Sequence, residues 1–324
     1  MPRFKINHIT KYSYQVPVID SANQVILFPL QDEYQEVVKQ KLKITNDPPV
    51  ERYSDYYGNE VGLFMHAEPH TELSIESRIE VITYPRVMPI DNVAKEEQWE
   101  HLIILKNEVP FIDFYNVGRF DAQEEIRAIV EGFDHKKTPL EISKELTNYV
   151  YENFQYITGI TSVETTLDEV WSLKAGVCQD FAHMLLVMLR MLGIPSRYVS
   201  GYICPNKNGM RGEGATHAWV EAYIPFYGWL GLDPTNNCIT NDMHVRLAVG
   251  RNFCDCSPVK GSYKGTAKHV LHVGVSVSYE DGHRYDDNAI MLTPQQPVEN
   301  GKNIEDVNSY RRYMEMMQQQ QQQQ

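Results

Sequence analysis

The sequence predicts an α+β protein, an all-β region followed by a region of helices and strands. Residues 1–90 hold short alternating or apolar segments between turn signals, with no helical periodicity. Residues 91–290 hold apolar residues at helical spacing, followed by further strands. We therefore expect an N-terminal β domain (1–90), a second domain (91–290) and a polar tail (291–324).

The N-terminal region alternates polar and apolar residues in the way of half-buried strands. Turn-forming clusters rich in Asn, Asp, Pro and Gly separate these segments and argue against helices. A run of strands without helices favours a sandwich-like domain. The expected strand segments are Lys5–Tyr14, Val25–Phe28, Gln40–Ile44 and Leu73–Thr83.

Helices are expected in the second region. Asp121–Phe133 is one candidate, and Thr165–Leu173 is a shorter one. Thr138, followed by Pro139 and then Glu141, predicts a helix start with a capping box, since Thr and Glu can each bond the other's backbone N–H.

The central stretch, residues 176–200, predicts a turn, one apolar helix and the start of a strand. Gly193 and Pro195 mark the end of the helix, and its low charge predicts burial. Cys178 stands at the mouth of this helix, where the macrodipole and unpaired N–H groups favour a thiolate. A buried structural cysteine is the alternative.

Two further candidates follow on a predicted hairpin. His217 begins the strand His217–Ile224, and Asp233 ends the strand Trp229–Asp233, with only four residues between the strands. The two side chains share a face only if paired residue numbers add to an even value, and we predict that register.

Each candidate also has an ordinary structural reading. A strand histidine is usually a hydrogen-bonded structural residue, and an aspartate before proline usually caps a turn. Together, Cys178, His217 and Asp233 supply a thiol nucleophile, a base and a group to orient the base. The combination favours nucleophilic catalysis.

Composition excludes several classes of partner. The chain has 324 residues and a formal net charge of −13, which argues against nucleic acid and anionic membranes. No apolar leader and no membrane-length apolar run is seen. Five cysteines without a pattern predict reduced thiols and a cytoplasmic location.

No metal or other cofactor is expected. Cys254 and Cys256 lack the usual zinc spacing, and His269 and His272 fall on opposite faces of a predicted strand. His183 lies on the same helix as Cys178 but five positions on, so it points elsewhere.

The stretches GVCQDFAHMLLVMLRMLGIPSRYVSGY and THAWVEAYIPFYGWLGLDPTNN resemble the transglutaminase-like superfamily of papain-like cysteine enzymes, in its bacterial and archaeal branch with an N-terminal β domain. The stretches HITKYSY, DYYGN and HVRLAVGR match as well. The resemblance implies a papain/transglutaminase-like core, with a buried central helix packed on an antiparallel sheet.

The resemblance also implies roles. Cys178 would be the nucleophile, His217 the general base and acid, and Asp233 the group that orients His217. A second oxyanion donor would precede Cys178, and Gln155 and Tyr156 stay open. Arg251, in the matching GR pair, is expected to form a buried ion pair near the site.

The expected function is hydrolysis of an amide or peptide bond through a thioester, with a protein or peptide as substrate. Two alternatives stay open: transamidation of protein glutamine, and an inactive scaffold that binds proteins. The tail from residue 291, which ends in the glutamine run 318–324, is expected to be disordered.

Overall fold

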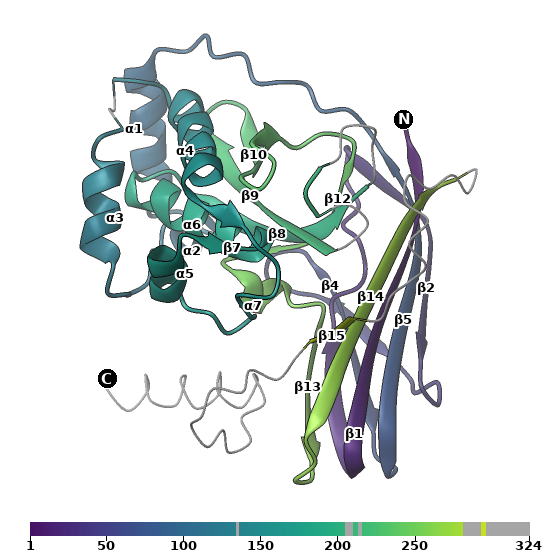
Figure 1. Cartoon of the computed structure of the whole chain (residues 1–324). Coiled ribbons are helices and arrows are strands. Elements are labelled where there is room, and N and C mark those ends of the chain that lie inside the picture. Colours follow the sequence, from purple (N-terminus) through teal and green to yellow (C-terminus); the bar gives the residue numbers. More distant parts are fainter. Residues whose placement is uncertain (134–135, 205–209, 213–215, 281–292, 296–324) are drawn as a thin grey trace. The chain divides into compact units, whose positions relative to one another are not determined.

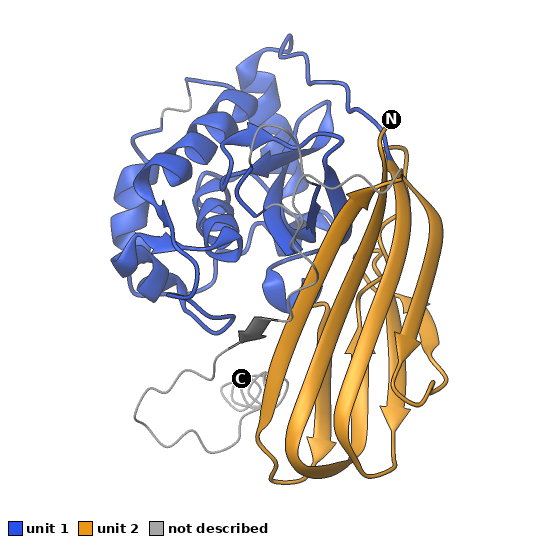
Figure 2. Ribbon diagram, turned by 45° about the vertical axis from the view of Figure 1, so that its right-hand side comes forward, with its two compact units in different colours: residues 1, 83–256 blue, residues 2–82, 257–324 orange. Residues whose placement is uncertain are grey.

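The structure is a computed structural model that describes residues 1–133, 136–204, 210–212, 216–280 and 293–295. The chain forms two compact units, coloured separately in Figure 2. One consists of residues 83–256, with Met1 grouped to it. It holds all the helices of the described residues together with strands, and is called the mixed unit below. The other combines residues 2–82 with the segment from residue 257 onward, and its described residues form strands.

The β unit is organised by one long strand, β1 (Arg3–Val25). Its first half lies between β14 (His269–Tyr279) and β5 (His70–Thr83), and its second half between β13 (Val259–Lys264) and β4 (Glu60–His66). The register shifts between Ser13 and Val18, so the strand changes partners there. β2 (Gln35–Ile44) pairs with β5 on the side that holds the first half of β1, and β3 (Glu51–Ser54) pairs with β4 on the side that holds its second half.

The division of the chain differs from the expected boundaries. Residues 259–279 fall within the range expected for the second domain, yet β13 and β14 both pair with β1. Alternation identifies a strand but carries no information about its partner, which here lies more than 200 residues away. Within the expected tail (291–324), Thr293–Gln295 forms β15 against β14. The rest of the tail lies outside the described residues.

Local sequence accounts for the helices of the mixed unit (Figure 1). The expected capping box at Thr138 is confirmed, and a second one at Thr166 begins another helix. The predicted Asp121–Phe133 helix is present but shorter. The helices are α1 (Lys95–Leu105), α2 (Phe111–Phe114), α3 (Gln123–Val130), α4 (Pro139–Asn153), α5 (Leu167–Leu173), α6 (Cys178–Met191) and α7 (Phe253–Cys256).

The strands of the mixed unit form a five-stranded antiparallel sheet in the order β11-β10-β9-β8-β12. A separate parallel pair joins β6 (Gln155–Tyr156) to β7 (Ala175–Gly176), just before the central helix. The sheet strands are β8 (Ser196–Ile203), β9 (Thr216–Ile224), β10 (Gly228–Asp233), β11 (Cys238–Ile239) and β12 (His244–Gly250).

The central helix α6 is buried, as its composition predicts. It packs against β8 and β9 and is contacted by α3, α4 and α5. Phe181, Leu185 and Met188 are fully buried, and each such side chain contributes about 1.5–3 kcal/mol of burial free energy. This packing fixes the start of the helix, where Cys178 stands. No helix among the described residues has the length and apolar character to span a membrane.

Candidate active site

The N-terminus of α6 is built by its own acidic residue. Val177 is the N-cap and has no side-chain oxygen, so Asp180 replaces it: Oδ2 accepts the backbone N–H of Val177 at 2.8 Å. The same oxygen accepts the hydroxyl of Thr161 at 2.7 Å. A Cβ at Gly176 would overlap the Asp180 carboxylate, so this position requires glycine. These contacts hold Cys178 as the first residue of the helix, half-exposed.

The hairpin of β9 and β10 brings His217 and Asp233 together. The pairing runs from Gly228 opposite Ile224 to Leu232 opposite Val220, so paired numbers add to an even value, and the predicted register is confirmed. His217 Nε2 lies 2.8 Å from Asp233 Oδ2, and both side chains are fully buried.

The other nitrogen of His217, Nδ1, is left for Cys178. Nδ1 is buried and has no hydrogen-bond partner within bonding distance among the described residues, and Cys178 is close enough to act on the pKa of the ring. Burial alone lowers the pKa of His217, but the charge and hydrogen bond of Asp233, then those of Cys178, raise that pKa to about 10. The imidazole is therefore held as an imidazolium beside the Asp233 carboxylate.

The backbone at Gly212 passes close over the same nitrogen. A Cβ on Gly212 would come within 2.9 Å of His217 Nδ1, and its φ of +83° also suits glycine. The neighbouring Arg211 contacts the segment after β10: its backbone N–H donates to Asn236 Oδ1 at 2.8 Å.

Asp233 is saturated with donors. Oδ1 accepts the backbone N–H groups of Thr235 (2.9 Å) and Asn236 (3.2 Å), and Oδ2 also accepts Asn236 Nδ2 at 2.8 Å. Burial raises the pKa of Asp233, but the His217 charge and the hydrogen bonds from His217 and His244 outweigh it and hold the pKa well below its usual range. The carboxylate stays ionised.

His244 is a site residue that sequence reasoning missed. It begins β12, and its Nε2 lies 3.3 Å from Asp233 Oδ2. The only signal was its place at the head of the HVRLAVGR stretch, which matches the family but does not indicate a role.

His217, Asp233 and His244 also lie close enough to serve as metal ligands, with their ligand atoms within 4.8 Å of one another. These atoms are already joined by hydrogen bonds through Asp233 Oδ2. The hydrogen bonds account for the cluster without an ion, and we assign no metal to it.

The remaining candidates are spread through the chain. Tyr156 is half-buried, and burial chiefly raises its pKa to about 12, with a smaller contribution from the nearby Cys178. Gln155 is exposed. His183 Nε2 accepts the Phe253 N–H at 3.1 Å, so it serves α7 rather than Cys178.

Arg251 does not form the buried ion pair that was expected. It does pair with Asp255 at 2.8 Å, but its side chain is 44% exposed. Its partner is only four residues away, so the pair bridges the end of β12 and the short helix α7 at the surface.

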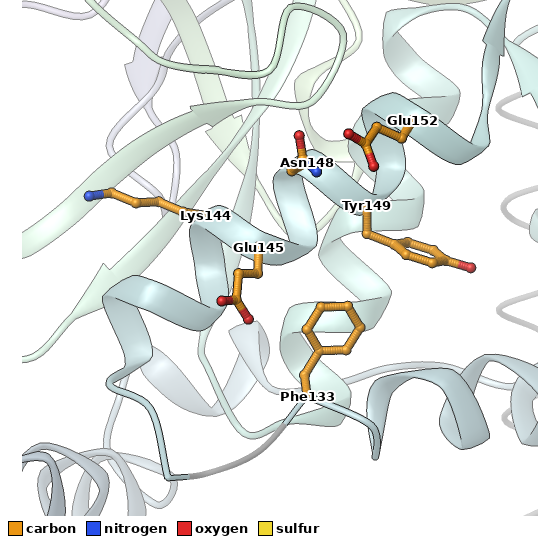
Figure 3. A pocket seen from close by; sticks show the side chains of 6 residues that line it. All are labelled: Phe133, Lys144, Glu145, Asn148, Tyr149 and Glu152. Atoms are coloured by element: carbon orange, nitrogen blue, oxygen red, sulfur yellow. The ribbon is translucent and has the colours of Figure 1, made fainter.

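A pocket of about 430 Å³ lies along α4 and does not include Cys178, His217 or Asp233. Figure 3 shows the side chains that line it, with the rings of Phe133 and Tyr149 in an edge-to-face arrangement at 6.0 Å. Its lining residues are Phe133, Lys144, Glu145, Asn148, Tyr149 and Glu152.

Comparison with known proteins identifies the family. The model of the transglutaminase-like superfamily matches residues 127–234, a range that contains Cys178, His217 and Asp233. The model of the bacterial transglutaminase-like N-terminal region matches residues 4–82. An uncharacterized protein of Mycobacterium leprae is 31% identical over 283 residues, 86% of this chain and 99% of that protein. The chain belongs to the transglutaminase-like superfamily.

Other members extend this comparison. An uncharacterized protein of Mycobacterium tuberculosis is 32% identical over 295 residues, 85% of this chain and 92% of that protein. A protein-glutamine gamma-glutamyltransferase of Pseudomonas aeruginosa is 25% identical over 172 residues, 50% of this chain and 24% of that protein.

One solved structure has the same fold over nearly its whole length. It is a candidate cysteine protease from Cytophaga hutchinsonii, with a TM-score of 0.69 and 23% identity. The match covers 89% of this chain and 96% of that one, so it includes the β unit as well as the mixed unit. At this identity the likeness establishes the fold and leaves the reaction to the residues of the site.

Proposed function

We propose that this superfamily member is a cysteine-dependent hydrolase of amide or peptide bonds. One observation carries the proposal: His217 donates from Nε2 to Asp233, and its Nδ1 stays available to Cys178, which is close enough to act on the pKa of the ring from the start of a buried helix. A thiolate, an imidazolium and a carboxylate in this order form the arrangement that acyl transfer through a thioester needs.

In the first half-reaction the Cys178 sulfur attacks the carbonyl carbon of the substrate. The carbonyl oxygen becomes an oxyanion, and the C–N bond then breaks. The leaving nitrogen takes its proton from His217 Nδ1, which leaves a neutral imidazole and a thioester on Cys178. Asp233 keeps the ring in one orientation throughout, because it holds Nε2 at 2.8 Å.

In the second half-reaction water replaces the amine. Neutral His217 takes a proton from the water through Nδ1 as the water oxygen attacks the thioester carbon. The C–S bond breaks, the carboxylic acid leaves, and the thiolate–imidazolium pair returns. The loss of the thiolate in the acyl-enzyme removes one of the two groups that raise the pKa of His217, which favours its action as a base at this stage.

The oxyanion needs two donors. Cys178 is the first residue of α6, so its backbone N–H has no acceptor within the helix and can serve as one donor. We infer that the second is the hydroxyl of Tyr156, because it is half-buried beside the thiolate whereas Gln155 is exposed. A Tyr156→Phe variant lacks only this donor.

Transamidation is the second candidate, because the relative from Pseudomonas aeruginosa carries the name of a glutamyltransferase. In that reaction a primary amine, instead of water, attacks the thioester. The substrate would be a protein or peptide with a carboxamide or peptide bond. No disulfide joins the five cysteines, all of which lie among the described residues, and we propose a reducing, cytoplasmic location.

The test is a screen of fluorogenic peptide amides and casein, with and without a dansylated primary amine. Hydrolysis that disappears in Cys178→Ala and falls strongly in His217→Ala supports the proposal. Incorporation of the amine at the expense of hydrolysis identifies the transferase. Equal turnover by wild type and Cys178→Ala, or thiol alkylation by iodoacetamide at pH 6 no faster than that of free cysteine, overturns it and leaves the scaffold alternative.

A further inference from the structure

Two histidines from different strands meet at one oxygen atom of Asp233. His217 reaches Oδ2 from β9 at 2.8 Å, and His244 reaches it from the start of β12 at 3.3 Å. β9 and β12 are not neighbours, since β8 lies between them in the sheet. His244 is 6% exposed, so water does not compete for this contact. The reaction proposed above uses only the first of the two histidines.

The hydrogen bonds of His244 define which of its nitrogens carries the proton. An ionised carboxylate oxygen can only accept, so the 3.3 Å contact with Asp233 Oδ2 requires the proton of the neutral ring on Nε2. Nδ1 lies 3.3 Å from two atoms of Asn241: the backbone N, whose N–H it accepts, and Oδ1, to which it would donate only if it carried the proton itself. A neutral ring with an accepting Nδ1 holds its proton on Nε2, which then donates to Asp233. The edge-to-face contact with Trp219, at 5.3 Å between ring centroids, keeps the imidazole in place.

The charges around His244 keep it neutral. Burial, the largest effect, lowers the pKa of His244, and the charges of His217 on β9 and Arg86 after β5 lower it further. The hydrogen bond and charge of Asp233 at the end of β10 act in the opposite direction but do not compensate. The net pKa lies below the usual value of about 6.5, so the ring is uncharged at neutral pH.

We propose that His244 is a positioning residue. It holds the Asp233 carboxylate in place and limits how strongly this carboxylate stabilises the His217 imidazolium. Its kinetic consequence rests on the proposed function. Oδ2 already accepts from His217 and Asn236, and His244 adds a third donor to the same oxygen.

The physical effect follows from sharing one negative charge among several donors. Each donor that is added to an ionised carboxylate stabilises its negative charge and lowers its proton affinity. His217 must release its proton to the leaving amine, and a general acid works best when its pKa is not far above the working pH. His244 therefore opposes part of the stabilisation that Asp233 gives to the imidazolium.

Two variants of similar size separate the donor from the side chain that carries it. Gln at 244 places an amide N–H near the position of Nε2, whereas Asn is too short to reach Asp233. The pKa of His217 is measured by NMR of the histidine-labelled chain between pH 5 and 11, with His217→Ala to assign the signal. We expect His244→Asn to raise this pKa by about half a unit to one unit, up to a tenfold change in proton affinity. His244→Gln should stay close to wild type.

The same two variants, His244→Asn and His244→Gln, are also compared by steady-state kinetics. In His244→Asn, kcat should fall several-fold with KM unchanged, and the alkaline limit of kcat/KM should move upward. An unchanged or lowered pKa of His217 in folded His244→Asn overturns the proposal, and so does an equal shift in both variants. The NMR titration needs no substrate, so its outcome stands even if amide turnover proves independent of Cys178 and the proposed function fails.

Discussion

Two buried carboxylates lie on adjacent strands of the same sheet, yet their partners differ in kind. Asp233, at the end of β10, is bonded by two histidines and an asparagine. Glu221, on β9, is fully buried among three arginines: Arg197 at 2.6 Å, and Arg86 and Arg246 at 3.5 Å each. Glu221 stands four residues beyond His217 on the strand that carries both.

The difference separates chemistry from support. Arginine keeps its charge at any ordinary pH, so the partners of Glu221 hold a fixed charge and cannot exchange protons with it. Histidine changes its charge near neutrality, so the partner of Asp233 can give up and regain a proton while the carboxylate stays ionised. Both clusters satisfy a buried charge, but only the first can take part in proton transfer.

The largest effect on activity is expected from Asp233→Asn. The charge that stabilises the His217 imidazolium disappears and the orientation of the ring is lost, so kcat/KM should fall about 10³- to 10⁴-fold. The alkaline limit of activity should also move to lower pH, since Asp233 raises the pKa of His217. Asp255→Asn, at the surface pair with Arg251, is the matched control and should stay within twofold. A loss no larger than in this control would contradict the role of Asp233.

Glu221→Gln should produce the reverse pattern. The side chain keeps its size but removes the buried negative charge that Arg246, which is buried, shares with the largely buried Arg86 and Arg197, which costs about 3–5 kcal/mol of the free energy of unfolding. Urea denaturation measures this loss. We expect kcat/KM of the folded protein to change by less than about threefold. If Glu221→Gln impairs turnover as strongly as Asp233→Asn, the two clusters are not functionally distinct.

The dependence of stability on pH should come from the Asp233 cluster. The pKa of His217 is raised to about 10 in the folded chain, so its contribution is complete below about pH 6.5 and is lost as the pH rises toward 10. The lowered pKa of Asp233 contributes stability above about pH 4 that is lost on acidification. The difference in urea midpoint between wild type and Asp233→Asn should therefore be larger at pH 6 than at pH 10. An equal difference at both values would show that the pair does not stabilise the fold.

The smallest effect is expected from removal of metal ions. The ligand atoms of His217, Asp233 and His244 are occupied by hydrogen bonds to one another. Dialysis against EDTA should leave kcat/KM within twofold of the untreated value. Loss of activity with EDTA, restored by one divalent cation, would show that this cluster is a metal centre. Metal binding, and not proton transfer alone, would then distinguish it from the Glu221 cluster.

The hairpin of β9 and β10 was predictable because the connection is so short: four residues were expected between the strands, and three join them in the structure. With so short a connection, counting along the two strands gives the parity of their pairing, and parity decides which side chains share a face. The capping box at Thr138 was equally accessible, because its contacts span three residues. The burial of α6 followed from its composition.

The partners of β13, β14 and His244 were not accessible in this way. Alternation in His269–Tyr279 predicted a strand, but its pairing with β1 spans most of the chain. His244 reaches Asp233 only because β12 pairs with β8, which places its first residue beside the end of the hairpin. Arg251 was expected in a buried ion pair, and whether its pair is buried depends on what covers it, which sequence does not state.

The sequence by itself determined the family, the central helix with Cys178 at its start, and the register that joins His217 to Asp233. These features are short in sequence separation or carried by specific motifs, so local geometry is enough. The tertiary structure decided that the chain returns to β1 to complete the β unit, and that a second histidine shares the oxygen on which His217 depends. Such contacts arise when distant strands pair, and no periodicity within one strand records the identity of its neighbour.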